Sequence, residues 1–298
     1  MVKAGHNSVL RRGKTMPKQS KSAWVLYHSH SGNTKKLADV AASLLAGSGW
    51  QVTCQSLKDF SPKTGAPDLL VLGTPVHFWR IPEPALRMIR RLPRQDGVNA
   101  FVFCTYGNVF AGDSLSYLEK EMSALGAKVI GAASVVAPHN FMTKGPARLG
   151  DADELFGKGQ PDEKTLELFK RAVAYTAKRG MDGWGNAVAP DQLLSPQRAV
   201  CLMDKAMPLS LKMKALAPVR FDASKCTDCG LCLKACDTYA VVRMDAKEKV
   251  IDRQRCTLCY ACARACPTGA LSVNWRQNEL FLRGAKKMVK DTGPRVVF

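Results

Sequence analysis

Two runs of cysteine in the last quarter of the chain offer the clearest chemistry. The first reads Cys226-Thr-Asp-Cys229-Gly-Leu-Cys232-Leu-Lys-Ala-Cys236, and the second reads Cys256-Thr-Leu-Cys259-Tyr-Ala-Cys262-Ala-Arg-Ala-Cys266. With C-x2-C-x2-C-x3-C spacing, three thiolates wrap one face of a [4Fe–4S] cluster and the fourth reaches the other cluster. We therefore expect one cluster on Cys226, Cys229, Cys232 and Cys266, and another on Cys256, Cys259, Cys262 and Cys236. Zinc also binds thiolates, but zinc ribbons use paired C-x2-C motifs, so duplicated four-cysteine runs favour iron and sulfur.

A second group of polar residues lies near the N-terminus. The apolar run 23–29 predicts a buried strand, and residues 35–45 follow with the apolar spacing of a helix. Between them stands Ser29-His30-Ser31-Gly32-Asn33-Thr34. Free N–H groups and the helix dipole bind phosphate at such a position, and the hydroxyl groups of this loop add donors. The loop is neither G-x-x-x-x-G-K-[ST] nor G-x-G-x-x-G, so we expect neither a nucleoside triphosphate nor a nicotinamide dinucleotide there.

The elements that position this loop alternate between strands and helices. Further strands are predicted at 51–54, 68–73, 100–104 and 128–136. Helices are predicted at 83–92, 113–125 and 163–179, with Asp113 as the N-cap of the second. This alternation predicts an α/β fold with a doubly wound, five-stranded parallel sheet. The polar loops that follow the strands then meet at the carboxyl edge of the sheet, where such folds bind ligands.

Three of these loops resemble the FMN-binding loops of flavodoxins. The loop 29–34 is similar to their serine- and threonine-rich phosphate loop. Residues 73–82 resemble the loop that stacks an aromatic ring on the flavin, and residues 105–108 resemble the second loop around the isoalloxazine ring. The resemblance implies that FMN contacts Ser29, His30, Ser31, Gly32, Asn33, Thr34, Thr74, Pro75, Val76, His77, Phe78, Trp79, Thr105, Tyr106, Gly107 and Asn108. The spacing of His77 and Trp79 differs from that in flavodoxins, which leaves open which ring stacks on the flavin.

Residues 23–275 as a whole resemble the flavodoxin–ferredoxin fusion proteins of anaerobic bacteria and archaea. The sequence Pro138-His139-Asn140-Phe141 after the fifth strand fits this group. The resemblance implies FMN and two [4Fe–4S] clusters, with a small α+β ferredoxin domain behind a flavodoxin-like one. The chain departs from ferredoxins at Asp237, which follows Cys236 where they usually have proline. We expect a carboxylate there to lower the potential of the neighbouring cluster.

Composition divides the chain into five parts. We expect residues 1–22 to be a basic disordered tail and residues 181–219 to be a linker with a short helix near 197–207. The resemblance makes residues 23–180 the FMN-binding domain. Residues 220–275 are the two-cluster domain, an internal repeat of about 30 residues with a hairpin between its runs. The basic tail 276–298 carries the apolar anchor Leu280-Phe281-Leu282. We expect the linker to pack between the domains; docking to a partner or a membrane surface is the alternative.

Charge narrows the range of partners. The net charge is +19, and two oxidised clusters of about −2 each would bring it to 19 − 4 = +15. A basic surface attracts an acidic redox protein or enzyme. We expect no nucleic acid, because neither a helix-turn-helix nor an aromatic–basic platform is present. No apolar stretch is long enough to span a membrane, and iron–sulfur ligands beside isolated thiols suit the cytoplasm.

These expectations converge on an electron-transfer protein. Clusters exchange one electron at a time and FMN exchanges one or two, so their combination converts between the two kinds of transfer. No nucleophile–base pair stands out in the sequence. The alternative is a flavin-dependent reductase that acts on a small organic acceptor, with the clusters as its electron supply.

Overall fold

A central sheet of six strands organises the computed structural model, which describes residues 21–62, 65–139, 156–183, 185–245, 248–289 and 293–298. The strand order is β10-β5-β4-β3-β1-β2. Five strands pair in parallel: β1 (Ser22–Tyr27), β2 (Gln51–Ser56), β3 (Leu69–Pro75), β4 (Asn99–Tyr106) and β5 (Lys128–Val136). The predicted doubly wound parallel sheet is therefore confirmed.

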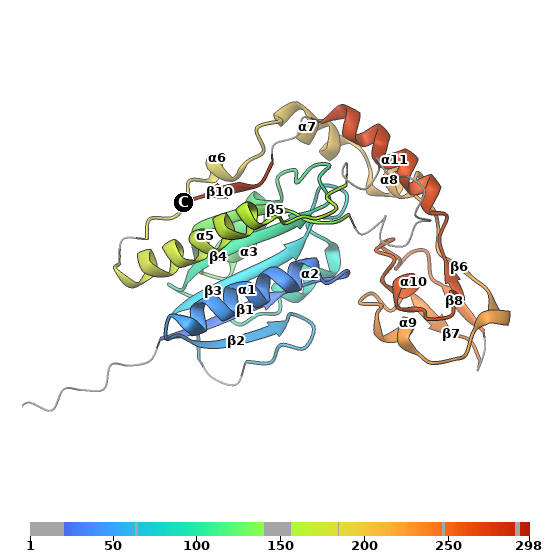
Figure 1. Cartoon of the computed structure of the whole chain (residues 1–298), viewed down its shortest axis with the longest axis horizontal. Helices are drawn as coiled ribbons and strands as arrows, with labels where there is room; N and C mark the ends of the chain where they lie inside the picture. The colour runs from blue at the N-terminus through green and yellow to red at the C-terminus, as the bar shows by residue number, and fades with distance from the viewer. Residues whose placement is uncertain (1–20, 63–64, 140–155, 184, 246–247, 290–292) are drawn as a thin grey trace, which may run out of the picture.

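The sixth strand was not predicted. The prediction of five strands is corrected by β10 (Arg295–Val297), which pairs antiparallel with β5. It comes from the tail 276–298, whose first part forms the helix α11 (Trp275–Met288). Three residues at the end of a basic segment are too few to show the alternation of apolar and polar residues that predicts a strand. The C-terminus thus returns to the sheet domain and closes its β5 edge (Figure 1).

Helices cover both faces of the sheet. On one face, α1 (Asn33–Gly47) and α5 (Glu163–Met181) bury Leu37 and Phe169 against strand residues such as Val25. On the other face, α2 (Glu83–Ile89) and α3 (Ser114–Ala124) pack around Leu26. Burial on both faces explains why the parallel strands read as nearly continuous apolar runs. The predicted helix 83–92 ends earlier, at Ile89.

The linker is helical and packs against the sheet domain. It contains α6 (Pro190–Leu193), α7 (Arg198–Ala206) and α8 (Leu209–Lys214), so the helix predicted near 197–207 is confirmed. One apolar cluster joins Phe110, which follows β4, to Cys201 of α7, Leu216 after α8 and Leu282 of α11. The linker and the C-terminal helix therefore share a core with the loops at the carboxyl edge of the sheet (Figure 1).

The cysteine-rich region (residues 220–275) has two related halves. In the first half lie β6 (Arg220–Phe221), the 3-10 turn Ala223–Lys225, α9 (Leu231–Lys234) and β7 (Val241–Arg243). The second half holds β8 (Lys249–Ile251), α10 (Ala261–Ala265) and β9 (Leu271–Ser272). The strands pair antiparallel as β6 with β9 and β7 with β8, which confirms the predicted hairpin.

The two cysteine runs have residues with left-handed backbone conformation at matching positions. Asp228 and Leu258 have φ values of 55° and 52°, and each stands just before the second cysteine of its run. Gly230 and Tyr260, just after that cysteine, have φ values of 71° and 58° and form the N-caps of α9 and α10. Non-glycine residues rarely adopt this conformation, so its recurrence at matching positions reflects a shared cysteine-loop geometry.

Two predictions concern residues that the structure does not describe. They are the basic tail, of which residues 1–20 are not described, and the segment after β5, of which Asn140 and Phe141 are not described. Among the residues that the structure describes, no helix is long and apolar enough to cross a membrane.

Candidate cofactor sites

The loop 29–34 forms the N-terminus of α1. Gly32 is the N-cap residue, with a left-handed φ of 89° that glycine adopts without strain. Its N–H donates to the hydroxyl of Ser29 at 3.1 Å. The first turn of α1 contains no acidic side chain. A helix start with unsatisfied N–H groups and no competing carboxylate suits an anionic group.

Side chains of this loop tie together the ends of three strands. The hydroxyl of Thr34 lies 2.8 Å from that of Thr105 at the end of β4. The amide of Asn33 donates to the carbonyl of Pro138, after β5, at 2.8 Å. The imidazole of His30 instead points toward His28 and stacks at a tilt near His77, with ring centroids 5.0 Å apart.

The second predicted loop leaves β3 through a tight turn. His77 and Arg80 exchange two backbone hydrogen bonds, of 2.8 and 3.0 Å. Between them Phe78 and Trp79 both have positive φ, 48° and 63°, as in a type I′ turn. Two bulky residues in this conformation are strained, and such strain is concentrated at functional sites. The turn presents both aromatic rings at the carboxyl edge of the sheet.

The hydroxyl of Thr74, near the end of β3, also indicates a binding surface at the carboxyl edge of the sheet. Thr74 is completely buried, and its Oγ1 has no hydrogen-bond partner among the described residues. A buried hydroxyl without a partner costs free energy unless a bound group satisfies it. This atom therefore fits a polar ligand held between the first two loops.

The third loop leaves β4 and brings the backbone close to a histidine. A Cβ at Gly107 would lie 2.1 Å from the His139 ring, so only glycine fits there. Burial lowers the pKa of His139 to about 3, which keeps the ring neutral. Asn108 follows in the left-handed region, with φ of 53°.

The second and third loops enclose a cavity that the C-terminal helix closes. Its walls come from these loops, from the segments just after them and from α11: Val76, His77, Phe78, Trp79, Tyr106, Gly107, Val109, Phe110, His139, Phe281, Leu282 and Ala285. An apolar, aromatic-lined cavity beside a phosphate-binding loop fits the ring system of a flavin. The contribution of α11 was not predicted from the sequence.

The linker holds the second loop through the buried carboxylate of Asp204. Asp204 of α7 accepts from Arg80 Nε at 3.0 Å and pairs with the ammonium group of Lys212. Asp204 and Lys212 are each 6% exposed. The backbone oxygen of Asp204 also accepts from Arg80 Nη2 at 2.7 Å and from Lys212 at 3.0 Å. The linker thereby fixes the turn that carries Phe78 and Trp79.

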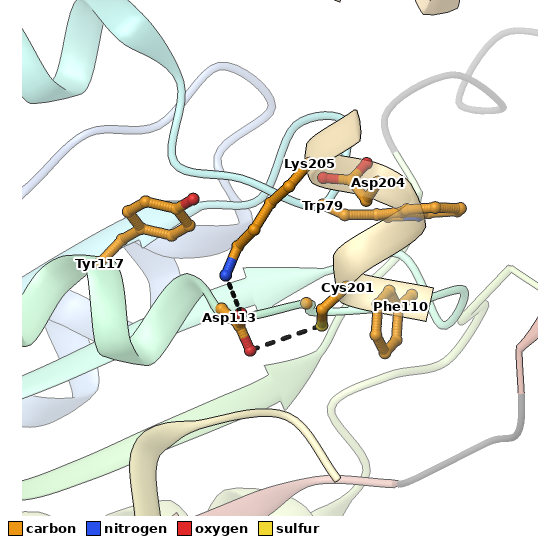
Figure 2. Close-up of a pocket in the computed structure, with 8 residues that line it drawn as sticks. Trp79, Phe110, Asp113, Tyr117, Cys201, Asp204 and Lys205 are labelled. Atoms are coloured by element: carbon orange, nitrogen blue, oxygen red, sulfur yellow. Dashed lines mark hydrogen bonds and ion pairs between the residues drawn. The ribbon is translucent and has the colours of Figure 1, made fainter. Parts of the chain in front are cut away.

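A second linker contact lies beside the first (Figure 2). Asp113 stands at the N-cap position of α3, as predicted, but its side chain makes no capping hydrogen bond. Its carboxylate instead accepts from Lys205 at 2.9 Å, from the backbone of Ser195 at 3.0 Å and from the Cys201 thiol at 3.4 Å. Burial raises the pKa of Asp113, but these hydrogen bonds outweigh burial and hold the pKa below its ordinary value. Asp113, which was predicted to cap a helix, therefore binds the linker with its side chain.

The cysteines gather in two groups. One pocket is lined by Cys226, Cys229, Cys232 and Cys266. In the other group, burial raises the pKa of Cys262 to about 12, with a further contribution from its neighbours Cys259, Cys256 and Cys236. Four thiols around one space suit a cluster that binds thiolates. The two groups correspond to the crossed ligand sets, which stay a prediction.

Polar groups surround the sulfur atoms. The ammonium group of Lys249 donates to Cys226 Sγ at 3.2 Å and to Asp228 at 2.8 Å. The backbone N–H of Ala240 donates to Cys236 Sγ at 3.1 Å. Hydrogen bonds to ligating sulfur stabilise the more negative, reduced state of a cluster, so they tune its potential.

The second cysteine run lies directly against the loop 29–34. The guanidinium of Arg264 bridges the two, donating to the carbonyl of His30 at 3.2 Å and to that of Cys259 at 3.0 Å. Lys58, which follows β2, donates to the carbonyl of Lys234 at 3.0 Å and lies 3.3 Å from Asp237. The residue that departs from the ferredoxin pattern, Asp237, is therefore at the contact between the two regions.

Known domains match both parts of the chain. The model of a flavodoxin domain matches residues 24–144, and the model of a 4Fe-4S dicluster domain matches residues 225–270. The chain is therefore a fusion of a flavodoxin domain with a 4Fe-4S dicluster domain. FMN and two [4Fe–4S] clusters are its cofactors, and its role is electron transfer.

Several solved structures are similar to part of the chain. A flavodoxin from the domain Archaea is 18% identical, with a TM-score of 0.41, and the match covers 54% of this chain and 99% of that one. Rubredoxin oxygen:oxidoreductase from the anaerobe Desulfovibrio gigas is 17% identical, with a TM-score of 0.41 and coverage of 55% and 37%. Oxidised flavodoxin 1 from Bacillus cereus is 18% identical, with a TM-score of 0.39 and coverage of 53% and 98%. No curated protein matches the chain.

Proposed function

We propose that this protein passes low-potential electrons between an acidic partner redox enzyme and FMN through its two clusters in series. The first-run cluster is the one assigned to Cys226, Cys229, Cys232 and Cys266, and the second-run cluster is the one assigned to Cys256, Cys259, Cys262 and Cys236. The contact of Arg264 with both Cys259 and the loop 29–34 carries the proposal. It favours the second-run cluster as the neighbour of the flavin.

The first-run cluster is the natural point of exchange with the partner. Of its four ligands Cys229 is exposed and Cys232 is buried, whereas the second-run set has no exposed ligand and two buried ones, Cys236 and Cys262. The exposed side chains of Lys225 and Arg243 stand near the first-run ligands, in ion pairs with Asp222 and Asp228. The net charge of +19 favours an acidic partner surface.

The proposed flavin site follows the same contacts. The loop 29–34 holds the phosphate with its backbone N–H groups and hydroxyls, while the cavity between the second and third loops holds the ring system. Bound FMN accepts one or two electrons, whereas each cluster accepts one. The chain's own part is to place the cofactors and to keep solvent from the ring, which α11 does by covering the cavity.

Counting electrons tests this proposal. Anaerobic reductive titration of the holoprotein is expected to take up about four electrons per chain, one for each cluster and two for FMN. Passage of the holoprotein over an anaerobic lysate should retain an acidic oxidoreductase, released by salt. Uptake of only two electrons, or retention that ignores salt, would count against the proposal.

The alternative, a reductase of small organic acceptors, needs open space beside the flavin ring. The cover formed by Phe281, Leu282 and Ala285 of α11 favours the carrier instead. Anaerobic assays with ferredoxin, quinones and enoates separate the two functions. Turnover of a small acceptor without a protein partner would establish the reductase.

A further inference from the structure

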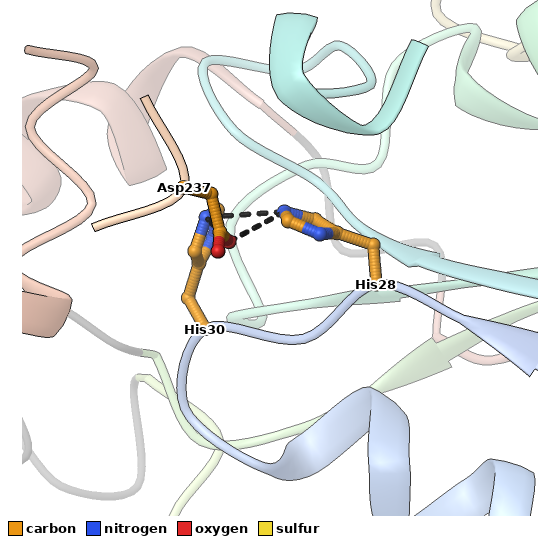
Figure 3. A group of neighbouring side chains, drawn as sticks. All are labelled: His28, His30 and Asp237. Carbon is orange, nitrogen blue, oxygen red and sulfur yellow. Dashed lines mark hydrogen bonds and ion pairs between the residues drawn. The ribbon is translucent and has the colours of Figure 1, made fainter. Parts of the chain in front are cut away.

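Three side chains converge where the two regions meet, outside both groups of cluster cysteines (Figure 3). His28 directly follows β1, His30 lies in the phosphate loop, and Asp237 comes from the cysteine-rich region. We propose that His28 Nε2, His30 Nε2 and Asp237 Oδ2 bind one zinc ion, and that this ion fastens the two regions together. Neither the sequence motifs nor the cofactors already described account for this group.

The spacing of the three atoms suits a shared ion. The two Nε2 atoms are 3.1 Å apart, and Asp237 Oδ2 lies 3.8 Å from that of His28 and 3.6 Å from that of His30. Zn–N distances of about 2.0–2.1 Å place tetrahedral ligands about 3.3–3.4 Å apart. The three observed separations bracket that value. Three protein ligands leave the fourth position for water, as in open zinc sites.

Hydrogen bonding accounts for only one contact of the group, the 3.1 Å hydrogen bond between the two imidazoles. Both distances from the carboxylate to the imidazoles exceed 3.5 Å, which is too long for a hydrogen bond. The imidazoles are nevertheless turned so that their Nε2 atoms face each other and the carboxylate. A cation at the centre of the three atoms gives each of them a partner at bonding distance.

Burial and the second carboxylate oxygen also favour a ligand role. The side chains of His28, His30 and Asp237 are 2%, 3% and 13% exposed. Buried imidazoles stay neutral, which is the form that binds metal. Asp237 Oδ1 lies 3.3 Å from the ammonium of Lys58, and this contact orients Oδ2 toward the imidazoles. Lys58 also repels a cation, so its removal should tighten binding of the ion.

A zinc ion at this site would also hold the two regions in a fixed position. Asp237 is the residue after Cys236, and His30 lies inside the phosphate loop. An ion held by both would fix the second-run cysteines against the flavin domain. Binding of that ion is measured separately from electron transfer, so the failure of either proposal leaves the other standing.

Zinc stoichiometry tests the inference. Holoprotein with both clusters and FMN is prepared anaerobically, dialysed against a chelator and then against Zn²⁺, and zinc and iron are counted by elemental analysis. We expect one zinc ion per chain in the wild type, and loss of zinc in His30→Gln and in Asp237→Asn with iron unchanged. Lys58→Gln and Cys54→Ser are the matched controls and should keep the zinc.

Two results would overturn the site. The first is a wild-type protein that binds no stoichiometric zinc. This result needs no variant, so it holds even if His30→Gln fails to fold. Zinc retained in both His30→Gln and Asp237→Asn would place the ion elsewhere. As a second readout, Co²⁺ in the wild type should give the absorption bands of a tetrahedral ion, and Asp237→Asn should lack them.

Discussion

Removal of the Asp204 carboxylate should loosen the flavin-binding turn. In Asp204→Ala the ammonium of Lys212 stays 6% exposed but loses its counter-ion, and Arg80 loses one of its two contacts. Breaking a buried ion pair by removing one partner costs about 3–5 kcal/mol. We expect the low end, about 3 kcal/mol, because the backbone oxygen of residue 204 still accepts from both cations.

Part of this loss should appear as weaker FMN binding. Arg80 closes the turn that holds Phe78 and Trp79, so the turn becomes free to leave its bound conformation. A tenfold change in Kd corresponds to about 1.4 kcal/mol. If half of the lost free energy bears on the turn, Kd for FMN rises about tenfold.

The assay is FMN titration of deflavinated protein together with denaturant unfolding. Lys205→Ala is the matched control on the same helix, because Lys205 is 47% exposed and its partner Asp113 keeps its hydrogen bonds from Ser195 and Cys201. It should cost less than Asp204→Ala, about 1–2 kcal/mol, because Lys205 itself is half exposed and the Asp113 carboxylate keeps two hydrogen bonds. Equal effects of the two variants on Kd and on stability would refute the reasoning.

Three further predictions concern the same elements. Gly107→Ala should displace His139, since the new Cβ would lie 2.1 Å from its ring, and should weaken FMN binding in the same titration; unchanged affinity would show that the third loop adapts. Deletion of residues 293–298 removes β10 and should speed hydrogen exchange of residues 132–134 in β5, while β2 is unaffected. The stability of the holoprotein should fall as pH drops from about 7 to 5, because His139 has a folded pKa of about 3 against 6.5 normally and so resists a proton that the unfolded chain binds. His139→Gln should reduce this slope without abolishing it, because burial also lowers the pKa of His28, His30 and His77. An equal slope in both proteins would contradict the prediction.

Local patterns in the sequence were sufficient to predict the five parallel strands and the three loops that follow them. Apolar runs and polar loops are encoded within a few residues, and the cysteine spacing specifies its own chemistry. Long-range contacts carry no such local signal. The strand β10 has three residues, and the pairing of Asp204 with Arg80 joins residues far apart in the chain. The signal for Asp237 was present as a departure from proline after Cys236, but its neighbour His28 could be identified only in the structure.

The most direct test of the electron path compares the fourth cysteine of each run. In Cys236→Ser, electron paramagnetic resonance should show that the second-run cluster is damaged and the first-run cluster is still reduced. Stopped-flow reduction of FMN by a low-potential protein donor should then be much slower than in the wild type. Cys266→Ser should spare the second-run cluster instead. If Cys236→Ser damages the first-run cluster, or leaves FMN reduction as fast as in the wild type, the proposed order of cofactors is wrong.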